Sequence, residues 1–389
     1  MSAPNLFDGP ALGSGAESLH DQNRRLGPRP AGSPGLLAAL EQSGLVGRGG
    51  AWFPTGVKWR SVASRGGPAV VIANGAEGEP LSRKDEALMS TRPHLVIDGA
   101  VIAAECVGAD RVYLYVGERH TAGWAAISRA LGERHPFDRA RARLVAAPAT
   151  YTAGEETAAV HFVDAGVATP TAIPPRPFES GVEGRPTLVN NVETLAGAAL
   201  VARFGAAAGR TLLLTVGGAV ARPGVIEVPV GSTVEEAMER AGGLVGEARA
   251  VLLGGYFGGW IDAAEARSLR LDPSAMKAAG GSLGCGVVSV LAAGSQPLEA
   301  TARIIGHLAQ ESAAQCGPCF FGLRSLAATT TRVAFGNGEA GDLERLRRWT
   351  AMVRGRGACR HPDGAAAFMD SALRVFQPEF AAAAAGRRR

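Results

Sequence analysis

The sequence predicts an α/β fold, in which an open sheet carries helices on its faces, followed by a smaller β domain and a helical C-terminal domain. The apolar runs Val70–Ala73 and Val112–Val116 indicate buried strands, while Leu95–Val107 and Ala122–Leu131 have helical spacing. Such alternation builds a sheet covered by helices. Near the C-terminus, three of the five cysteines gather among short helical segments. Clustered cysteines between short helices favour a small bundle built on a metal centre.

Shifts in composition and periodicity divide the chain into six stretches. The first, residues 1–35, is rich in Gly, Pro, Ser and Ala and is expected to be a flexible N-terminal arm. The expected divisions after it are an α/β domain at 36–208, a β domain at 209–262, a connector at 263–295, a helical domain at 296–380 and a tail at 381–389.

The β domain has the pattern of a β-grasp unit. Two strands, TLLLTVGGAV and VIEVPV, are joined by the turn ARPG, and VLLGG forms a third strand at 251–255. Between them, Ser232 and Glu235 have the spacing of a capping box before a helix at 233–241. Gly242 and Gly243 are expected to end that helix.

Composition narrows the functional class. Of 389 residues, 46% are hydrophobic and 20% charged, with a net charge of +4 and no basic stripe, so no nucleic-acid partner is expected. The terminal Arg387–Arg389 is interpreted as solvated. No apolar run reaches the roughly 18 residues of a membrane span, and no signal peptide is evident at the N-terminus. Clustered cysteines indicate a reducing compartment and ligand roles rather than disulfides, so a cytoplasmic location is expected.

The first candidate binding segment is a glycine-rich loop, GLVGRGGAWFPTGVKW, at Gly44–Trp59. Glycines let the backbone approach a ligand closely, and bare N–H groups can cradle a phosphate. Arg48 and Lys58 add positive charge, and Phe53 could cover a planar ring. The alternative interpretation is a mobile surface loop.

Three further loops carry polar residues suited to a nucleotide. NGAEGEP, at Asn74–Pro80, follows a predicted strand directly, and ligands bind beyond the carboxyl ends of strands in open α/β sheets. Its amide and carboxylates suit a polar heterocycle or ribose, although a solvated acidic loop is the alternative. In Tyr151–Val160, Glu155 and Glu156 could bind a ligand or cap a helix. In Leu188–Gly197, Asn190 and Asn191 have the same two interpretations.

The cysteine set is one ligand short of a complete site. Cys316 and Cys319 form a C-x-x-C pair, and Cys359 returns in GACRHPDG. Three thiolates could hold an iron–sulfur cluster, a structural zinc ion or a redox dithiol. Cys106 and Cys285 have apolar surroundings and are expected in the core.

Taken together, these motifs resemble the NADH-binding flavoprotein subunit of respiratory complex I and its relatives in NAD-reducing hydrogenases and formate dehydrogenases. The likeness covers about Gly44 to Phe380. GRGGAWFPTG-K, the N-x-x-E-x-EP loop, GEETA, NNVET, the β-grasp unit and the CGPC–CRHPDG pair occur in the family's order. The resemblance implies a Rossmann-like FMN domain, a β-grasp domain of the soluble-ligand-binding type and a helical iron–sulfur domain. It also implies hydride transfer from NADH to FMN, then single-electron transfer to the cluster and partner carriers.

The resemblance also assigns residues, and it implies no catalytic group beyond the flavin. The implied cofactor-binding positions are Gly47, Arg48, Gly49, Gly50, Phe53, Lys58, Asn74, Glu77, Glu79, Glu155, Glu156, Asn190, Asn191 and Thr194. Of these, Phe53 matches an aromatic on the nicotinamide side, and Glu79, Glu155 and Glu156 match positions lining the dinucleotide site. The implied cluster ligands are Cys316, Cys319 and Cys359. The implied partners are NADH and a small [2Fe–2S] subunit or ferredoxin-like carrier.

The chain departs from the family pattern at several positions. Ala313 stands where the first cluster cysteine occurs, so we expect a [4Fe–4S] cluster with an incomplete cysteine set, or a [3Fe–4S] cluster. Ser312, Gln315 and His361 are nearby candidates for an oxygen or nitrogen ligand. Ile173 lies where the family often carries positive charge near the nucleotide. Two alternatives therefore stay open: a flavoprotein with a donor other than NADH, and a non-catalytic binding or assembly subunit.

Overall fold

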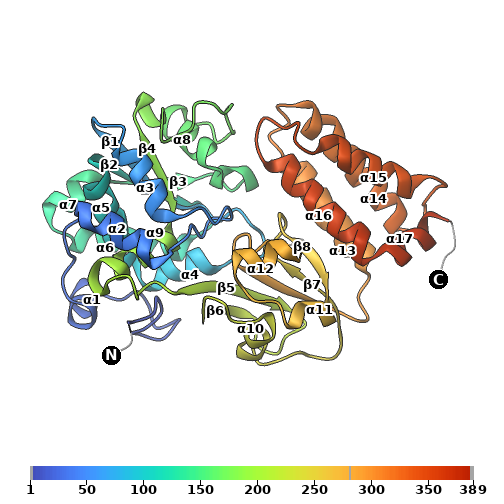
Figure 1. Ribbon diagram of the computed structural model, residues 1–389, viewed down its shortest axis with the longest axis horizontal. Helices are drawn as coiled ribbons and strands as arrows, with labels where there is room; N and C mark the ends of the chain where they lie inside the picture. Colours follow the sequence, from blue (N-terminus) through green and yellow to red (C-terminus); the bar gives the residue numbers. More distant parts are fainter. Residues whose placement is uncertain (1–2, 280–281, 386–389) are drawn as a thin grey trace. The chain divides into compact units, whose positions relative to one another are not determined.

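A computed structural model describes the chain over residues 3–279 and 282–385 (Figure 1). The chain divides into two compact units. The first comprises Met1–Gly78, Ser82–Leu213 and Glu227–Val230, and the second comprises Glu79–Leu81, Leu214–Ile226 and Gly231–Arg389. Arg387–Arg389, which the sequence predicts to be solvated, lie outside the described residues. Within the described part of the chain, no helix is both long and apolar enough to cross a bilayer.

The first unit is built on a parallel sheet with the strand order β3-β2-β1-β4. Its strands are β1 (Ala69–Gly75), β2 (Ala109–Gly117), β3 (Ala142–Ala147) and β4 (Thr187–Asn191). The first two confirm the predicted strands. β1 lies between β2 and β4, with Ile72 opposite Tyr113 on one side and Val189 on the other. The carboxyl ends of β1 and β4 therefore lie side by side.

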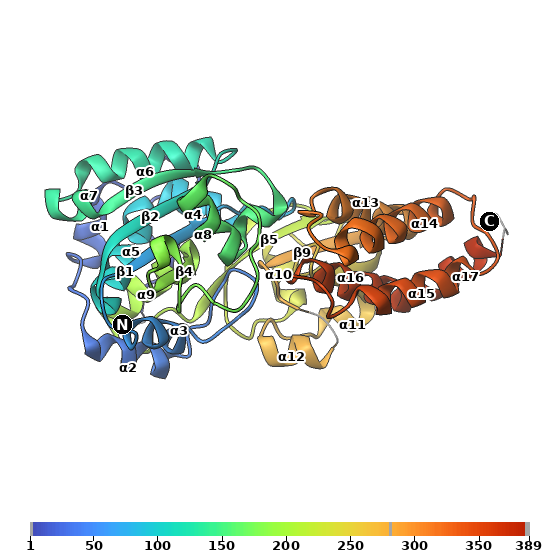
Figure 2. The same ribbon diagram turned by 90° about the horizontal axis from the view of Figure 1, so that it is seen from above.

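Helices cover both faces of this sheet (Figures 1 and 2). They are α1 (Leu19–Leu26), α2 (Pro34–Ser43), α3 (Thr55–Ala63), α4 (Lys84–Thr91), α5 (Pro93–Val107), α6 (Thr121–Glu133), α7 (Pro136–Arg141), α8 (Glu156–Ala165) and α9 (Val192–Phe204), with 3₁₀ turns at Tyr151–Gly154 and Val182–Gly184. Side chains alternate between the two faces of a strand. Val71 and Ala73 accordingly pack with α5 and α9, whereas Val70 and Ile72 pack with α8.

The N-terminal segment is part of this core, contrary to the predicted flexible arm. Leu6 and Leu26 are buried in the main cluster. The Gln22 side chain, which is fully buried, donates a hydrogen bond from Nε2 to Asp98 Oδ2 at 2.8 Å. Arg92 donates from Nη2 to the carbonyl of Phe7 at 2.9 Å. Long-range polar contacts of this kind order a segment whose composition alone indicates a loop.

The second unit begins with a five-stranded sheet of order β6-β5-β9-β7-β8. Its elements are β5 (Thr211–Gly218), β6 (Gly224–Pro229), α10 (Val234–Arg240), β7 (Ala248–Leu253), β8 (Gly259–Asp262), α11 (Ala263–Arg267), α12 (Pro273–Ala278) and β9 (Val287–Ala292). β9 runs parallel to β5 and antiparallel to β7. It lies in the predicted connector, so the sheet extends beyond residue 262. The capping box is also one residue later than predicted, at Thr233 and Glu236.

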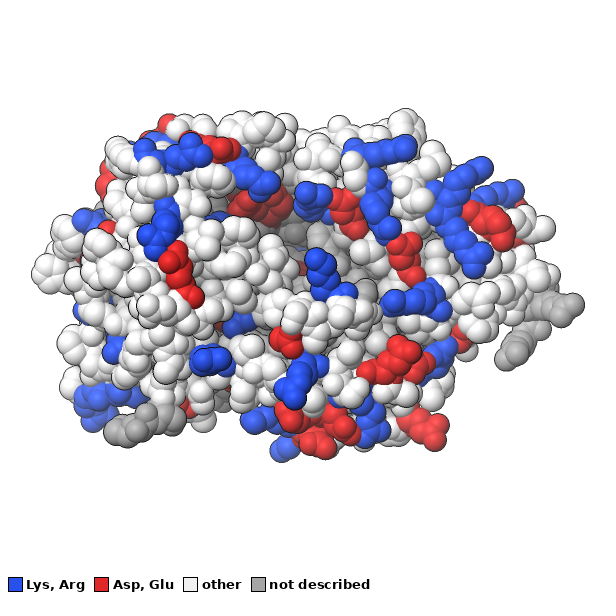
Figure 3. All heavy atoms as spheres, viewed as in Figure 1, with Lys and Arg blue, Asp and Glu red and all other residues white. Residues whose placement is uncertain are grey.

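The C-terminal part of the second unit is a helical bundle. It contains α13 (Pro297–Gln310), a π-helical turn η3 (Pro318–Leu323), α14 (Arg324–Ala334), α15 (Asp342–Val353), α16 (His361–Val375) and α17 (Gln377–Ala384). The bundle packs on β8 because Ser371 Oγ accepts a hydrogen bond from the Trp260 amide at 2.9 Å, and the Trp260 ring lies 5.5 Å from that of Phe376. In Figure 3, Lys and Arg side chains gather over α15.

Gly99 sets the contact between α5 and α9. A Cβ at this position would lie 2.0 Å from the carbonyl oxygen of Leu195. We expect Gly99→Ala to force the helices apart and to lower the free energy of unfolding by about 1–3 kcal/mol, measured by urea denaturation. Gly132→Ala is the control, because Gly132 lies on α6 with nothing near its Cβ position. Its expected effect is a gain of about 0.5–1 kcal/mol. Two similar values would contradict the assignment.

Candidate functional site

The glycine-rich loop between α2 and α3 is closed by backbone hydrogen bonds. The Gly47 amide donates to the Phe53 carbonyl at 2.8 Å, and the Thr55 amide donates to the Leu45 carbonyl at 2.9 Å. Gly50 has φ 110°, which favours glycine. A Cβ on Gly49 would lie 3.4 Å from Asn191 Cβ. The loop therefore lies against the carboxyl end of β4, where the sequence places its asparagines.

Arg48 anchors this loop from within. Its backbone amide donates to Thr194 Oγ1 at 2.8 Å, and its Nη2 donates to the Thr211 carbonyl at 3.0 Å. The side chain is buried, and its guanidinium lies 4.7 Å from the ring centroid of Trp52. Burial lowers the pKa of Arg48, partly offset by Glu193. Arg48 Nη1 is buried without a hydrogen-bond partner among the described residues, so one donor remains for a ligand.

The predicted asparagines meet at the carboxyl edge of the sheet. Ala73 pairs with Asn190 and Asn74 pairs with Asn191 across β1 and β4. Asn190 Oδ1 accepts a hydrogen bond from Trp59 Nε1 at 2.8 Å. Asn74 Nδ2 donates to the Gly154 carbonyl at 2.8 Å, and Asn191 Oδ1 accepts from the Glu193 amide at 2.9 Å. Four segments far apart in sequence thus converge here, as the motifs predicted.

Beneath this edge lies a buried charge cluster that sequence reasoning missed. Lys84 Nζ lies 2.7 Å from Asp85 Oδ1 and 2.8 Å from Glu193 Oε2, and all three side chains are at most 5% exposed. Asp85 Oδ2 accepts from Asn191 Nδ2 at 2.6 Å. The charged run RKDE after the second loop and the Glu of NNVET were the available signals. Their pairing over more than a hundred residues could not be read locally.

Two of the predicted carboxylates cap helices. Glu77 accepts from the amides of Asp85 and Glu86 at 2.9 and 3.0 Å, at the start of α4. Glu155 accepts from the Thr157 and Ala158 amides at 2.9 Å, at the start of α8. Burial raises the pKa of Glu155, although these hydrogen bonds oppose the shift.

The remaining predicted residues are more varied in position. Lys58 Nζ lies 2.8 Å from Glu156 Oε2, and both side chains are a quarter to a third exposed. Phe53 is 51% exposed on the glycine-rich loop. Glu79 belongs to the second unit, where its Oε2 accepts from the Tyr256 amide at 2.8 Å.

The three C-terminal cysteines are neighbours. Burial raises the pKa of Cys319 to about 12, and the nearby thiols of Cys316 and Cys359 raise it further, whereas a hydrogen bond from Ser312 lowers it. No group of three metal-binding side chains among the described residues is arranged to hold an ion. The donor set nevertheless suits three corners of an iron–sulfur cluster, because clusters take cysteine thiolates.

The candidates for a fourth ligand separate clearly. His361 Nε2 lies 2.6 Å from the Leu308 carbonyl, and its buried ring packs edge-on against Phe257. Gln315 is exposed. Ser312 is the candidate that contacts the cysteine set, through its hydrogen bond to Cys319.

Two other cysteines lie elsewhere and are half-buried rather than in the core. Cys106 donates to the Ser33 carbonyl at 3.5 Å, and burial raises its pKa to about 11. Cys285 donates to the Gly254 carbonyl at 3.6 Å.

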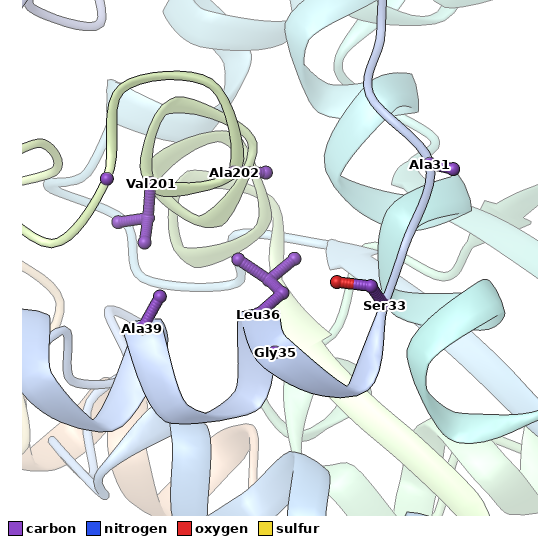
Figure 4. Close-up of a pocket in the computed structure, with 8 residues that line it drawn as sticks. Ala31, Ser33, Gly35, Leu36, Ala39, Val201 and Ala202 are labelled. Atoms are coloured by element: carbon purple, nitrogen blue, oxygen red, sulfur yellow. The ribbon is translucent and has the colours of Figure 1, made fainter.

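A separate hollow of about 230 Å³ lies between α2 and α9 (Figure 4). In the close-up, Leu36 and Ala39 point toward Val201, and Ser33 lies at one side. It is lined by Ala31, Ser33, Gly35, Leu36, Ala39, Val201, Ala202 and Gly205. It has no charged lining, so it does not offer the polar groups that a nucleotide requires.

The fold and these sites define a nucleotide-binding α/β protein with a cysteine-bearing helical domain. Known families match the same divisions. Residues 40–199 match the Nuo51 FMN-binding domain, 213–255 an SLBB domain, and 299–383 the NADH-ubiquinone oxidoreductase-F iron-sulfur binding region.

Relatives that match over most of their length agree. One of the two NADH-quinone oxidoreductase F subunits of Rhizobium meliloti (strain 1021) is 32% identical over 89% of this chain and 88% of its own length. The NADH-quinone oxidoreductase F subunit of Aquifex aeolicus (strain VF5) is 31% identical over 79% and 76%. The chain belongs to the family of NADH-quinone oxidoreductase F subunits.

A solved structure shares the fold. A chain of an NAD⁺-reducing [NiFe]-hydrogenase in the H₂-reduced state superposes with a TM-score of 0.80 at 29% identity. The match covers 92% of this chain and 63% of the hydrogenase chain, so this protein spans somewhat under two thirds of that neighbour.

The buried cluster around Lys84 provides a test of the site's foundation. Lys84→Met leaves Asp85 and Glu193 facing each other without a cation, so we expect the free energy of unfolding of the cofactor-free protein to fall by about 3–5 kcal/mol. Lys58→Met breaks a partly exposed pair and should cost about 1 kcal/mol or less. Urea denaturation measures both. Equal losses would show that the Lys84 cluster does not stabilise the fold.

Proposed function

We propose that this chain oxidises NADH with a bound FMN and delivers the electrons to a protein electron carrier. The observation that carries the proposal is the convergence of the glycine-rich loop with Asn74, Asn190 and Asn191 at the carboxyl edge of β1 and β4. Ligands of open parallel sheets bind at this edge. The unpartnered Arg48 Nη1 and the close approach of Gly49 to Asn191 fit a polar, phosphate-bearing cofactor.

Each predicted residue then has a part in binding. The amides of Gly47, Gly49 and Gly50 face a phosphate, and Lys58 adds charge beside it. Thr194 holds the loop through the Arg48 amide. Asn74, Asn190 and Asn191 present amide groups whose orientation is fixed by the protein. Glu77 acts indirectly, because it caps α4 and so positions Lys84 and Asp85.

Bound FMN supplies the conversion of a two-electron hydride transfer into one-electron steps. The protein supplies orientation and shielding from water. Phe53, half exposed on the loop, is suited to cover a planar ring of the donor. Glu79, Glu155 and Glu156 are assigned to the dinucleotide, of which Glu155 acts by fixing the start of α8. Cys316, Cys319 and Cys359 would hold the iron–sulfur cluster.

The absorbance spectrum of anaerobically purified protein tests the proposal. We expect a flavin band that bleaches on addition of NADH. Parallel titrations with NADPH and reduced ferredoxin distinguish another donor. Gly49→Val should abolish FMN uptake because the larger side chain fills the space beside Asn191, while Gly132→Ala should retain it. A wild-type protein that takes up no FMN would refute the proposal and favour a non-catalytic role.

The incomplete cysteine set makes a second prediction. With three thiolates, the wild-type cluster should lose one iron on mild oxidation and show the EPR signal of an oxidised [3Fe–4S] cluster. Ala313→Cys should retain four irons per chain and lose that signal. Gln315→Cys, which adds a thiol on an exposed residue nearby, is the matched control. Identical iron content and spectra in all three proteins would contradict the assignment.

A further inference from the structure

Large apolar side chains are exposed directly beside the cysteine set. Phe320 and Phe321 are 43% and 70% exposed, and their rings pack edge to face with centroids 4.8 Å apart. Met352, at the end of α15, is 49% exposed. We call these three residues the aromatic end. Contiguous exposed apolar groups with a polar surround mark interaction sites.

Packing places the aromatic end at a single end of the bundle. A Cβ on Gly322 would lie 2.2 Å from Val353 Cγ1, so the π-helical turn packs tightly against the C-terminus of α15. Phe321 and Met352 immediately precede these two contacting residues. Cys319, which is only 3% exposed, immediately precedes Phe320. The exposed rings therefore cover the turn that carries a predicted cluster ligand.

Positive charge surrounds the aromatic end. Residues 311–360 contain eight arginines, four carboxylates and no lysine. The Arg324 guanidinium lies 4.5 Å from the Phe320 ring centroid. Arg348 is exposed one helical turn before Met352 and so shares its face of α15. Arg356 is exposed in the segment between Met352 and Cys359. The gathering of basic side chains over α15 in Figure 3 is consistent with this census.

We propose that the aromatic end is the docking surface for a small acidic electron-carrier protein, an inference that rests on the proposed function. An apolar centre with a charged rim is the usual anatomy of a protein interface, and aromatic and arginine side chains dominate binding energy. The excess of arginine selects a partner with acidic residues around its own redox centre, by charge complementarity. Exposed aromatics beside a predicted cluster ligand bring such a centre close to the electron donor.

The electron balance fixes the stoichiometry. Oxidation of one NADH to NAD⁺ releases two electrons and one proton. Two oxidised one-electron carriers each take one electron, so two carriers dock in turn for each NADH. Rapid release of the reduced carrier is therefore required. A compact patch of three apolar residues with a charged rim suits such a transient complex better than a large obligate interface does.

An acidic plant-type [2Fe–2S] ferredoxin is the probe. Binding of oxidised ferredoxin is measured by calorimetry, and its NADH-driven reduction is followed by absorbance. Phe321→Ala and the double variant Arg348→Glu/Arg356→Glu should each weaken binding and lower kcat/KM for ferredoxin about tenfold or more. Phe335→Ala and Arg240→Glu are matched controls, since both residues are exposed elsewhere in the second unit. These controls should leave binding unchanged.

Two further measurements separate the possible failures. NADH oxidation with ferricyanide, which needs no docking surface, should be unchanged in every variant. Loss of that activity in wild type would refute the proposed function, whereas calorimetry would still decide the docking surface. Wild-type binding should weaken steeply with salt, and the double variant should lose most of this dependence.

Four outcomes would overturn the proposal. Ferredoxin binding could be unaffected by both test variants, or equally weakened by the controls. Basic cytochrome c could bind as tightly as ferredoxin does. Finally, sedimentation could reveal a dimer that Phe321→Ala dissociates, which would assign the aromatic end to self-association.

Discussion

The buried ammonium group of Lys84 is the interaction on which the candidate flavin site depends. Burial alone lowers the pKa of Lys84, but Asp85 and Glu193 outweigh it and raise that pKa above its ordinary value. Asp85 in turn accepts a hydrogen bond from Asn191, and Glu193 accepts one from the Leu213 amide at 2.9 Å. A charge this deep is tolerated only when it is fully paired. Lys84 therefore couples α4, the start of α9 and β5 into a fixed base.

This base explains why so many residues of the site interact with the protein itself. Arg48 joins the same network through Glu193, whose Oε1 lies 3.7 Å from its Nε. Glu77 caps α4, and Asn190 is held by Trp59. Such contacts fix side chains before a ligand arrives, which lowers the entropy lost on binding. The direct contacts then fall to the glycine amides, which need no side chain, and to the remaining donor of Arg48.

The extent to which the sequence predicted this arrangement follows from the range of each interaction. The strands β1 and β2 and the helices α5, α6 and α15 were predicted because their apolar spacing is local. The binding loops were predicted because they follow strands or match family motifs. Lys84 and Glu193 were missed because their pairing is made by the tertiary fold. Gln22 shows the same limit: it is buried by Asp98, 76 residues away, in a segment whose composition indicates disorder.

At the other end of the chain, a single turn performs two tasks. The π-helical turn η3 buries Cys319 and Leu323 while it exposes Phe320 and Phe321 between them. This requires close packing on α15, which Gly322 permits because any side chain there would collide with Val353. Short π-helical segments occur preferentially at functional sites. Because Ala313 removes a thiolate from the same region, the remaining cysteines depend more on this turn for their placement. Substituting Gly322 should therefore disturb cluster retention and carrier docking together, whereas Phe321→Ala should affect docking alone.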